Sequence, residues 1–240
     1  MCYNEHMKKV FIVFLVLLTV SGLLTGCTEE EKEDNMRFKE EYESLNGQVS
    51  DSDKAYRVIE IPENNPFVYT TCEELVERIN NGETFIVYFG ANWCPWCRST
   101  LPYFVEGCLN LNIKKVYYVD VRKDYKLKNE IRDVYSYDDN DKIYLSHEGT
   151  KGYHDFCALC DSILEEYNSN GVTLDGTEFE GAKRIDAPSF IMIVDGKPFK
   201  LIDGLSSRQY DPDMELNSLI IRDMRSEIEY FLVDYLEAQE

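Results

Sequence analysis

The 240-residue sequence is poor in basic residues, contains no long hydrophobic run and shows no internal repeat. It contains 25 lysines and arginines and 45 aspartates and glutamates, so the formal net charge is −20. The phosphates of nucleic acid would repel such a chain, which argues against nucleic acid as a partner. Apolar residues make up 44% of the chain and aromatics 13%, so we expect a globular protein rather than a disordered one.

The N-terminus is organised like a bacterial secretory signal. Lys8 and Lys9 precede an almost unbroken apolar run over residues 10–20, which is shorter than the roughly 20 residues that a membrane-spanning helix needs. Small residues follow, and the four that end at Cys27, Leu-Thr-Gly-Cys, resemble the cleavage box of bacterial lipoproteins. The resemblance implies that residues 1–26 are a lipoprotein signal peptide and that Cys27 is lipidated. The alternative is a chance cysteine behind an ordinary signal peptide or anchor.

A lipidated Cys27 would place the mature protein in the bacterial cell envelope. It would be anchored to the outer face of the cytoplasmic membrane, or to the outer membrane if the species has one, where no glutathione pool keeps thiols reduced. Residues 27–58 are dominated by Glu, Lys, Asp, Asn and Ser, which predicts a flexible acidic tether behind the lipid. The folded domain is then expected over residues 59–240.

Strand and helix patterns alternate along much of the remaining chain. Thr71 and Glu74 match a capping box, and Asn81-Gly82 would end the helix that starts there. Uninterrupted apolar runs predict strands that are covered on both faces. The predicted strands are 85–89, 116–121, 189–194 and 199–202, and the predicted helices are 72–80, 99–109, 127–135, 153–167 and 214–238.

Two C-x-x-C pairs stand out among the cysteines that follow the signal. The first lies in Trp93-Cys94-Pro95-Trp96-Cys97, directly after a predicted strand, and Ala187-Pro188-Ser189 precedes the last two predicted strands. The order strand, C-x-x-C, helix, strand, proline, hairpin and helix resembles the thioredoxin fold over roughly residues 70–121 and 184–238. Residues 122–183 would then be an insertion before the proline, which we expect to be largely helical.

The resemblance implies an α/β fold, with a mixed sheet flanked by helices, in which Pro188 is cis and faces the C-x-x-C motif. It also implies a catalytic centre made of Cys94, Cys97 and Pro188, with a redox-active Cys94–Cys97 disulfide and no other cofactor. A helix N-terminus stabilises negative charge, so Cys94 should be the exposed attacking thiol and Cys97 the buried resolving one.

The residues around the first pair are candidates for contact with a client protein. Trp93 and Trp96 would flank the sulfur with apolar surface, although plain packing is an equal alternative for both. Pro95 suits the first turn of a helix, where its missing N–H is not needed. The predicted client-binding residues are Trp93, Pro95, Trp96 and Ala187.

Three nearby positions add detail or depart from the family pattern. Many thioredoxins carry a buried Asp six residues before the first motif cysteine, and this position is Tyr88 here. The residue before the proline is Ala187 rather than the commoner Thr, Val or Ile. Arg98, one residue past the pair, is predicted to lie on the surface.

The second pair, Cys157 and Cys160, lies in the insertion, and three interpretations remain open for it. It is a structural disulfide, a second redox pair that exchanges electrons with Cys94 and Cys97, or a metal site completed by His154. We predict no zinc site shared by the two pairs, because they are too far apart in sequence for a zinc ribbon. Two further cysteines, Cys72 and Cys108, are predicted to be buried small apolar residues.

The sequence therefore predicts a membrane-anchored extracytoplasmic thiol–disulfide oxidoreductase that acts on protein cysteines through Cys94 and Cys97. Its expected partners are protein clients with thiols or disulfides, a membrane or extracellular redox partner, and the membrane itself through the lipid. The alternative is a non-catalytic binding or accessory lipoprotein of the same fold, in which both pairs are fixed structural disulfides.

Overall fold

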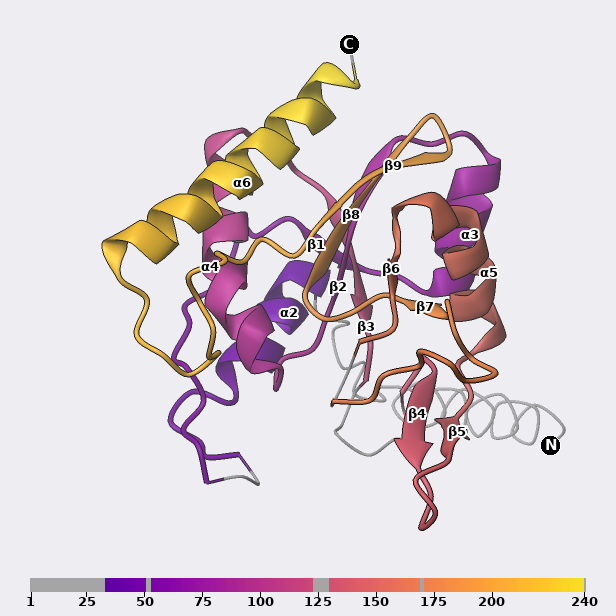
Figure 1. Ribbon diagram of the computed structural model, residues 1–240. Helices are drawn as coiled ribbons and strands as arrows, with labels where there is room; N and C mark the ends of the chain where they lie inside the picture. Colours follow the sequence, from indigo (N-terminus) through magenta and orange to yellow (C-terminus); the bar gives the residue numbers. More distant parts are fainter. Residues whose placement is uncertain (1–32, 51–52, 123–129, 169–170, 240) are drawn as a thin grey trace, which may run out of the picture. The chain divides into compact units, whose positions relative to one another are not determined.

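The computed structural model describes residues 33–50, 53–122, 130–168 and 171–239 (Figure 1). The expected signal peptide and Cys27 lie outside these ranges. Among the helices that are described, none combines the length and the apolar character needed to cross a membrane.

A five-stranded mixed sheet forms the centre of the fold, in the order β1-β3-β2-β8-β9. The strands are β1 (Phe67–Tyr69), β2 (Phe85–Gly90), β3 (Val116–Asp120), β8 (Ser189–Val194) and β9 (Lys197–Ile202). β2 runs parallel to β3 and antiparallel to β8, so that Tyr88 lies between Tyr118 and Phe190. β3 also pairs in parallel with β1, and β8 pairs with β9 as a hairpin.

Helices cover both faces of this sheet (Figure 1). α3 (Cys72–Asn80) and α5 (Lys151–Cys160) lie on one face, and α2 (Asp34–Glu43), α4 (Pro95–Asn110) and α6 (Ser218–Glu237) lie on the other. Every residue of β2 is therefore buried, as its uninterrupted apolar sequence predicts. The expected α/β class, a mixed sheet flanked by helices, is confirmed.

The predictions that rest on strong local sequence motifs are confirmed. The capping box of α3 is present: Glu74 N donates to Thr71 Oγ1 at 3.3 Å, and Thr71 N donates to Glu74 Oε2 at 3.2 Å. The β8–β9 hairpin turns at Asp195 and Gly196, whose φ angles are 49° and 68°. Glycine is required at the second position, because a Cβ there would lie 2.3 Å from the carbonyl oxygen of Ile79.

The tether prediction is wrong for residues 34–43, which form α2. α2 places Phe38 and Tyr42, both 0% exposed, in the core of the domain. The Phe38 ring stacks on Phe67, with 4.1 Å between the centroids, and meets Tyr118 edge-on at 4.8 Å. The acidic composition concealed this helix because only one narrow stripe of it faces inward.

The insertion is not largely helical. Its elements are α5, a 3₁₀ turn η2 (Asp161–Ile163), the pair β4 (Val134–Tyr137) with β5 (Ile143–His147), and the short pair β6 (Glu165–Glu166) with β7 (Lys183–Arg184). The predicted helix at 127–135 is wrong where it is described, and residues 127–129 lie outside the described ranges. β-branched and aromatic side chains favour strand pairing at β4, and that preference outweighed the helical spacing.

Candidate thiol site

Cys94 caps the N-terminus of α4. Its backbone is extended (φ −71°, ψ 117°), and its Sγ accepts a hydrogen bond from the N–H of Cys97 at 3.2 Å. Pro95 occupies the first helical turn, as expected. The first motif cysteine therefore lies at the positive end of a helix dipole, where negative charge on sulfur is stabilised.

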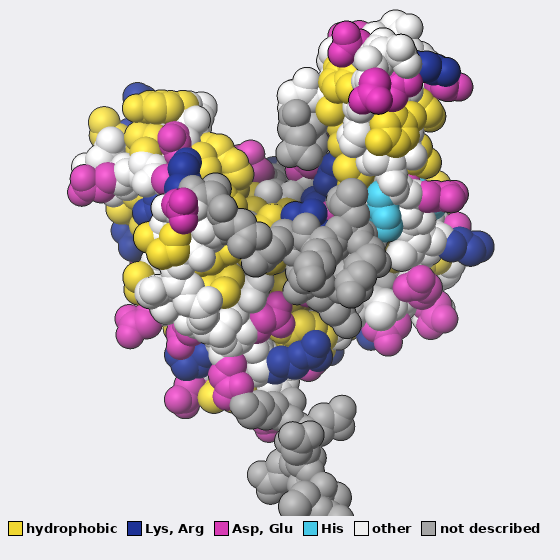
Figure 2. Space-filling model, turned by 90° about the horizontal axis from the view of Figure 1, so that it is seen from below, with side chains coloured by type: hydrophobic (Ala, Val, Ile, Leu, Met, Phe, Trp, Pro, Cys, Tyr) yellow, Lys and Arg dark blue, Asp and Glu magenta, His cyan; other side chains and the backbone are white. Residues whose placement is uncertain are grey.

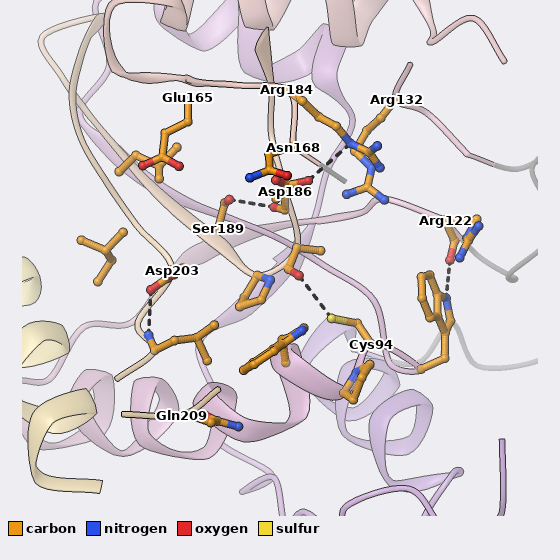
Figure 3. A pocket seen from close by; sticks show the side chains of 18 of the residues that line it. Cys94, Arg122, Arg132, Glu165, Asn168, Arg184, Asp186, Ser189, Asp203 and Gln209 are labelled. Atoms are coloured by element: carbon orange, nitrogen blue, oxygen red, sulfur yellow. Dashed lines mark hydrogen bonds and ion pairs between the residues drawn. The ribbon is translucent and has the colours of Figure 1, made fainter. Parts of the chain in front are cut away.

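The proline segment lies against this cysteine. The Ala187-Pro188 peptide bond is cis. The Cys94 thiol donates to the carbonyl oxygen of Ala187, with 3.3 Å between sulfur and oxygen (Figure 3). The N-terminus of α4 and the segment before β8, which are far apart in the sequence, thus meet at the Cys94 sulfur. The resemblance implies a cis Pro188 that faces the C-x-x-C motif, and the peptide bond before Pro188 is cis here.

Both sulfurs of the pair are shielded from solvent. Cys94 is 5% exposed and Cys97 is 0% exposed. Cys97 is buried as predicted, but the expectation of an exposed Cys94 is wrong, because the carbonyl of Ala187 and the neighbouring side chains cover it. All six described cysteines are free thiols in the structure, so the two disulfides remain predictions.

Cys94 opens onto a cavity of about 880 Å³. The predicted client-binding residues all line it: Trp93, Pro95, Trp96 and Ala187, together with Pro188. Cys94, Pro95 and Trp96 place this cavity at the start of α4. Figure 2, which shows the molecule from below, has a hollow that holds basic and hydrophobic side chains. Of the two motif cysteines, Cys94 lines this cavity.

The surroundings of the pair favour one negative charge and oppose a second. Burial raises the pKa of the Cys94 thiol well above its usual value, and the neighbouring Cys97 raises it further. Burial also opposes ionisation of Cys97, but hydrogen bonds from Cys94, Tyr88 and the backbone of Ala91 together lower its pKa. Ionisation of Cys97 is therefore favoured over ionisation of Cys94, and Cys94 must lose its proton before it can act as a nucleophile.

Tyr88 occupies the position where the family often has an acid. Its fully buried hydroxyl is hydrogen-bonded to Cys97 and lies 3.0 Å from the hydroxyl of Tyr42. Gly90 makes room for the ring, because a Cβ at that residue would lie 2.1 Å from the Tyr88 hydroxyl oxygen. The second motif cysteine is thus stabilised by a neutral hydroxyl donor, which is itself positioned by α2.

Replacing Tyr88 by phenylalanine should make the thiolate of the pair harder to form, since a hydrogen bond to a charged group contributes roughly 1.5 kcal/mol. The bond lowers the pKa of Cys97, so its loss moves the titration to higher pH. The ultraviolet absorbance of the thiolate, followed against pH, measures this shift. Tyr235→Phe, a change of another buried tyrosine on α6, should leave the titration unchanged. An unchanged titration in Tyr88→Phe would show that the hydroxyl does not stabilise Cys97.

Arg98 is not a surface residue. It is 0% exposed, and its guanidinium donates to the carbonyl oxygens of Arg57 and Tyr42, each at 2.8 Å, and of Asn92 at 3.0 Å. A fourth bond at 2.8 Å goes to Oδ1 of Asn46. Arg98 therefore holds the segment that follows α2 against the start of α4, close to the thiol pair.

The second cysteine pair lies beside a third cysteine. α5 packs against α3, so closely that a Cβ on Gly152 would lie 2.2 Å from the carboxylate of Glu73. Burial raises the pKa of Cys72, and the neighbouring Cys157 and Cys160 add to that effect. Cys72 is buried, as predicted, and so is Cys108. Burial also raises the pKa of Cys157 and Cys160 to about 12, so both are poor nucleophiles at neutral pH.

The described residues do not support a metal site at Cys157 and Cys160. His154 Nε2 lies 2.9 Å from Asp133 Oδ1 instead of facing the two cysteines as a third ligand. Across the described ranges, no group of three or more His, Cys, Asp or Glu side chains is placed to hold a metal ion. The structural disulfide and the second redox pair remain predictions.

Several charged residues of the cavity were not predicted from the sequence. Glu130, Arg132, Arg184 and Asp186 line it, and all four belong to the insertion or its junction with β8. The sequence held one usable signal, since Arg184 and Asp186 precede Pro188 by only a few residues. The sequence around Arg132 held no such signal, because no local pattern predicts how the insertion runs past the cavity.

Comparison with known proteins adds no relative from which a role could be transferred. The chain matches no family model, no curated protein and no solved structure. Its function therefore rests on the geometry of Cys94, Cys97 and Pro188.

Proposed function

We propose that the protein is an extracytoplasmic thiol–disulfide oxidoreductase of thioredoxin-like fold, which acts on protein cysteines through Cys94 and Cys97. The contact of the Cys94 thiol with Ala187, beside the cis Pro188, carries the proposal. A motif cysteine at a helix N-terminus and a remote cis-proline segment meet at one sulfur, and a cavity leads to it. Such a sulfur is placed for exchange with an incoming disulfide.

The arrangement of elements supports the thioredoxin-like fold. β2, the C-x-x-C motif, α4 and β3 follow one another, and the cis-proline, the β8–β9 hairpin and α6 come later. These are the elements on which the sequence resemblance rests. The insertion between β3 and β8 adds charged groups to the cavity, which a minimal domain of this kind would not have.

The reaction is a two-step exchange. The Cys94 thiolate bonds to one sulfur of the client disulfide, whose S–S bond breaks and releases a client thiolate that takes up a proton. Cys97 then attacks the Cys94 sulfur, which frees the second client thiol. The client gains two electrons and becomes a dithiol, and Cys94 and Cys97 become a disulfide. The reverse sequence oxidises a client dithiol.

The location in the envelope follows from the N-terminal motif. Lipidation at Cys27 would hold the folded domain, which starts at α2, close to the membrane surface. The clients would be envelope or secreted proteins, and a redox partner in the membrane or outside it would reset the pair. Labelling with a radioactive fatty acid, lost in Cys27→Ala, tests the anchor.

A Cys97→Ala variant should accumulate mixed disulfides between Cys94 and client proteins, because the resolving thiol is gone. The variant is expressed in the native host, free thiols are blocked with acid and alkylating agent, and bound proteins are identified after non-reducing electrophoresis. Cys97→Ala combined with Cys94→Ser is the matched control and should capture none.

The near-complete burial of Cys94 favours the competing function, a non-catalytic accessory lipoprotein. In that case Cys97→Ala would capture no more client than the double variant. Capture that depends on Cys157 or Cys160 instead of Cys94 would move the active thiol to the insertion. Either result would contradict the assignment of Cys94 as the attacking sulfur.

A further inference from the structure

We propose that Arg122, Arg132 and Arg184 form a subsite that binds a carboxylate carried next to the reacting sulfur of the substrate. The inference rests on the proposed function and adds the chemical class of the substrate, a disulfide or thiol with an anionic group close to sulfur. It concerns the cavity wall that the insertion forms. The residues of this wall take no part in the exchange chemistry itself.

The three arginines lie on the Cys94 side of the cavity. All three line it together with Cys94 and Trp93. The Arg122 guanidinium lies over the Trp93 ring at 4.2 Å from its centroid, and Trp93 Nε1 donates to the carbonyl oxygen of Arg122 at 3.0 Å. Figure 3 shows the Arg132 and Arg184 side chains next to each other, on the same side as Arg122.

Carboxylates lie beside each of these cations. Glu130 binds Arg132 through two bonds of 2.7 and 2.9 Å, and lies 3.9 Å from Arg122. Asp186 lies 3.5 Å from Arg184. Three guanidinium groups therefore lie on this wall with the carboxylates of Glu130 and Asp186 among them, and Glu165 is the cross-strand partner of Arg184.

Three further acids line the cavity, and one of them, Glu165, is the cross-strand partner of Arg184. Glu165, Asp203 and Glu227 also line the cavity, so it is not basic as a whole. Figure 3 shows Glu165 and Asp203 on the side away from Arg122 and Arg132. Arg122 and Arg132 thus lie on the side away from Asp203, while Arg184 has Glu165 opposite it in the β6–β7 pair. An anionic substrate would be oriented with its charge toward the three arginines.

Arg184 has donor capacity that the described residues do not use. It is 7% exposed, and its Nη1 has no hydrogen-bond acceptor among them. Its guanidinium lies 5.0 Å from the centroid of the Tyr167 ring, which gives a cation–π contact but no acceptor oxygen. A buried N–H without an acceptor is costly, and a carboxylate oxygen in the cavity would satisfy it.

The probe is dithiodipropionate, a small disulfide with a carboxylate near each sulfur, and it is compared with neutral hydroxyethyl disulfide and cationic cystamine. Cys94 takes one half of the probe, mercaptopropionate leaves, and attack by Cys97 releases the second. The probe is reduced to two thiols and the pair is oxidised. Each rate is divided by that of a free small thiol with the same disulfide, which removes differences in intrinsic reactivity.

The wild-type chain should prefer dithiodipropionate to the neutral disulfide by about tenfold at low salt, and less at high salt. Arg184→Gln should abolish most of this ratio, and Arg122→Gln provides a second test at a less buried site. Arg225→Gln, which removes an exposed arginine paired with Glu106, is the matched control and should keep the ratio. A ratio near one in the wild type, insensitive to salt, would overturn the subsite.

Binding separates this inference from the proposed function. Cys94→Ser cannot start exchange, so its salt-dependent binding of dithiodipropionate, measured by calorimetry, reports the arginines alone. One outcome is that Arg184→Gln abolishes the binding while Cys94 exchanges with none of the three disulfides. This result would support the subsite and refute the oxidoreductase. The opposite outcome is that Cys94 exchanges with the disulfides but the chain neither binds dithiodipropionate nor prefers it to the neutral disulfide. This result would support the oxidoreductase and refute the subsite. A peptide disulfide flanked by glutamates, if preferred to dithiodipropionate, identifies the carboxylate as part of a protein client.

Discussion

Replacing Arg98 by methionine should lower the free energy of unfolding by about 3 to 5 kcal/mol. Methionine keeps much of the apolar stem, but it leaves the carbonyl oxygens of Tyr42, Arg57 and Asn92 without their donor. Each buried acceptor that loses its partner costs about 1 to 3 kcal/mol. Some of this loss is offset because the buried charge is removed as well.

The measurement is thermal or urea unfolding of the chain from residue 28 onward, followed by circular dichroism. For a domain of this size the loss corresponds to a fall in melting temperature on the order of 10 °C. Arg225→Met is the matched control, because Arg225 is 52% exposed and its bond to Glu106 should contribute about 1 kcal/mol or less. A similar small effect in both variants would show that Arg98 does not stabilise the fold.

Arg98 also illustrates why part of this fold escaped sequence reasoning. Its partners lie in the segment after α2 and in the loop before Cys94, and no local pattern pairs these positions with it. The same segment was predicted to be a tether because its composition is acidic. Phe38 and Tyr42 are the only two residues of α2 that are buried. Two aromatic anchors in a polar helix give too weak a periodic signal to outweigh composition.

Elements whose signals are local were predictable. The capping box of α3, the uninterrupted apolar run of β2 and the Asp195-Gly196 turn each depend on residues within one short stretch, and each is present. The meeting of Cys94 with Ala187 is remote in sequence, but it could be anticipated from the thioredoxin resemblance. The cavity wall built by Arg132 and Glu130 could not, because the resemblance does not extend to the insertion.

The acidity of the thiols was only partly foreseen. The helix N-terminus at Cys94 is present, but burial raises the pKa of that thiol, and the charge is favoured on Cys97. Sequence reasoning counted the helix dipole and could not count the loss of solvent at a sulfur covered by Ala187. Nor could it show that Tyr88 supplies a hydrogen bond in place of the missing acid.

Replacing Cys94 by serine should reduce the rate of exchange with a disulfide by on the order of a thousandfold or more, because serine forms no thiolate at neutral pH and Cys97 does not reach the cavity. Reduction of dithiodipropionate by the chain, coupled to an excess of dithiothreitol, gives the rate. Cys108→Ser is the matched control. That thiol is buried in α4, burial raises its pKa, and its loss should leave the rate nearly unchanged.

The central claim, that Cys94 and Cys97 exchange electrons as a pair, is tested most directly by redox equilibration. The full chain is held in glutathione buffers of stepped composition, quenched with acid and alkylated, and the thiols of peptides that contain Cys94 and Cys97 are counted by mass spectrometry. We predict an intramolecular Cys94–Cys97 disulfide that forms and disappears reversibly along one two-electron titration curve. A pair that stays reduced in every buffer, a disulfide that no buffer reduces, or a bond from Cys94 to another cysteine would contradict it.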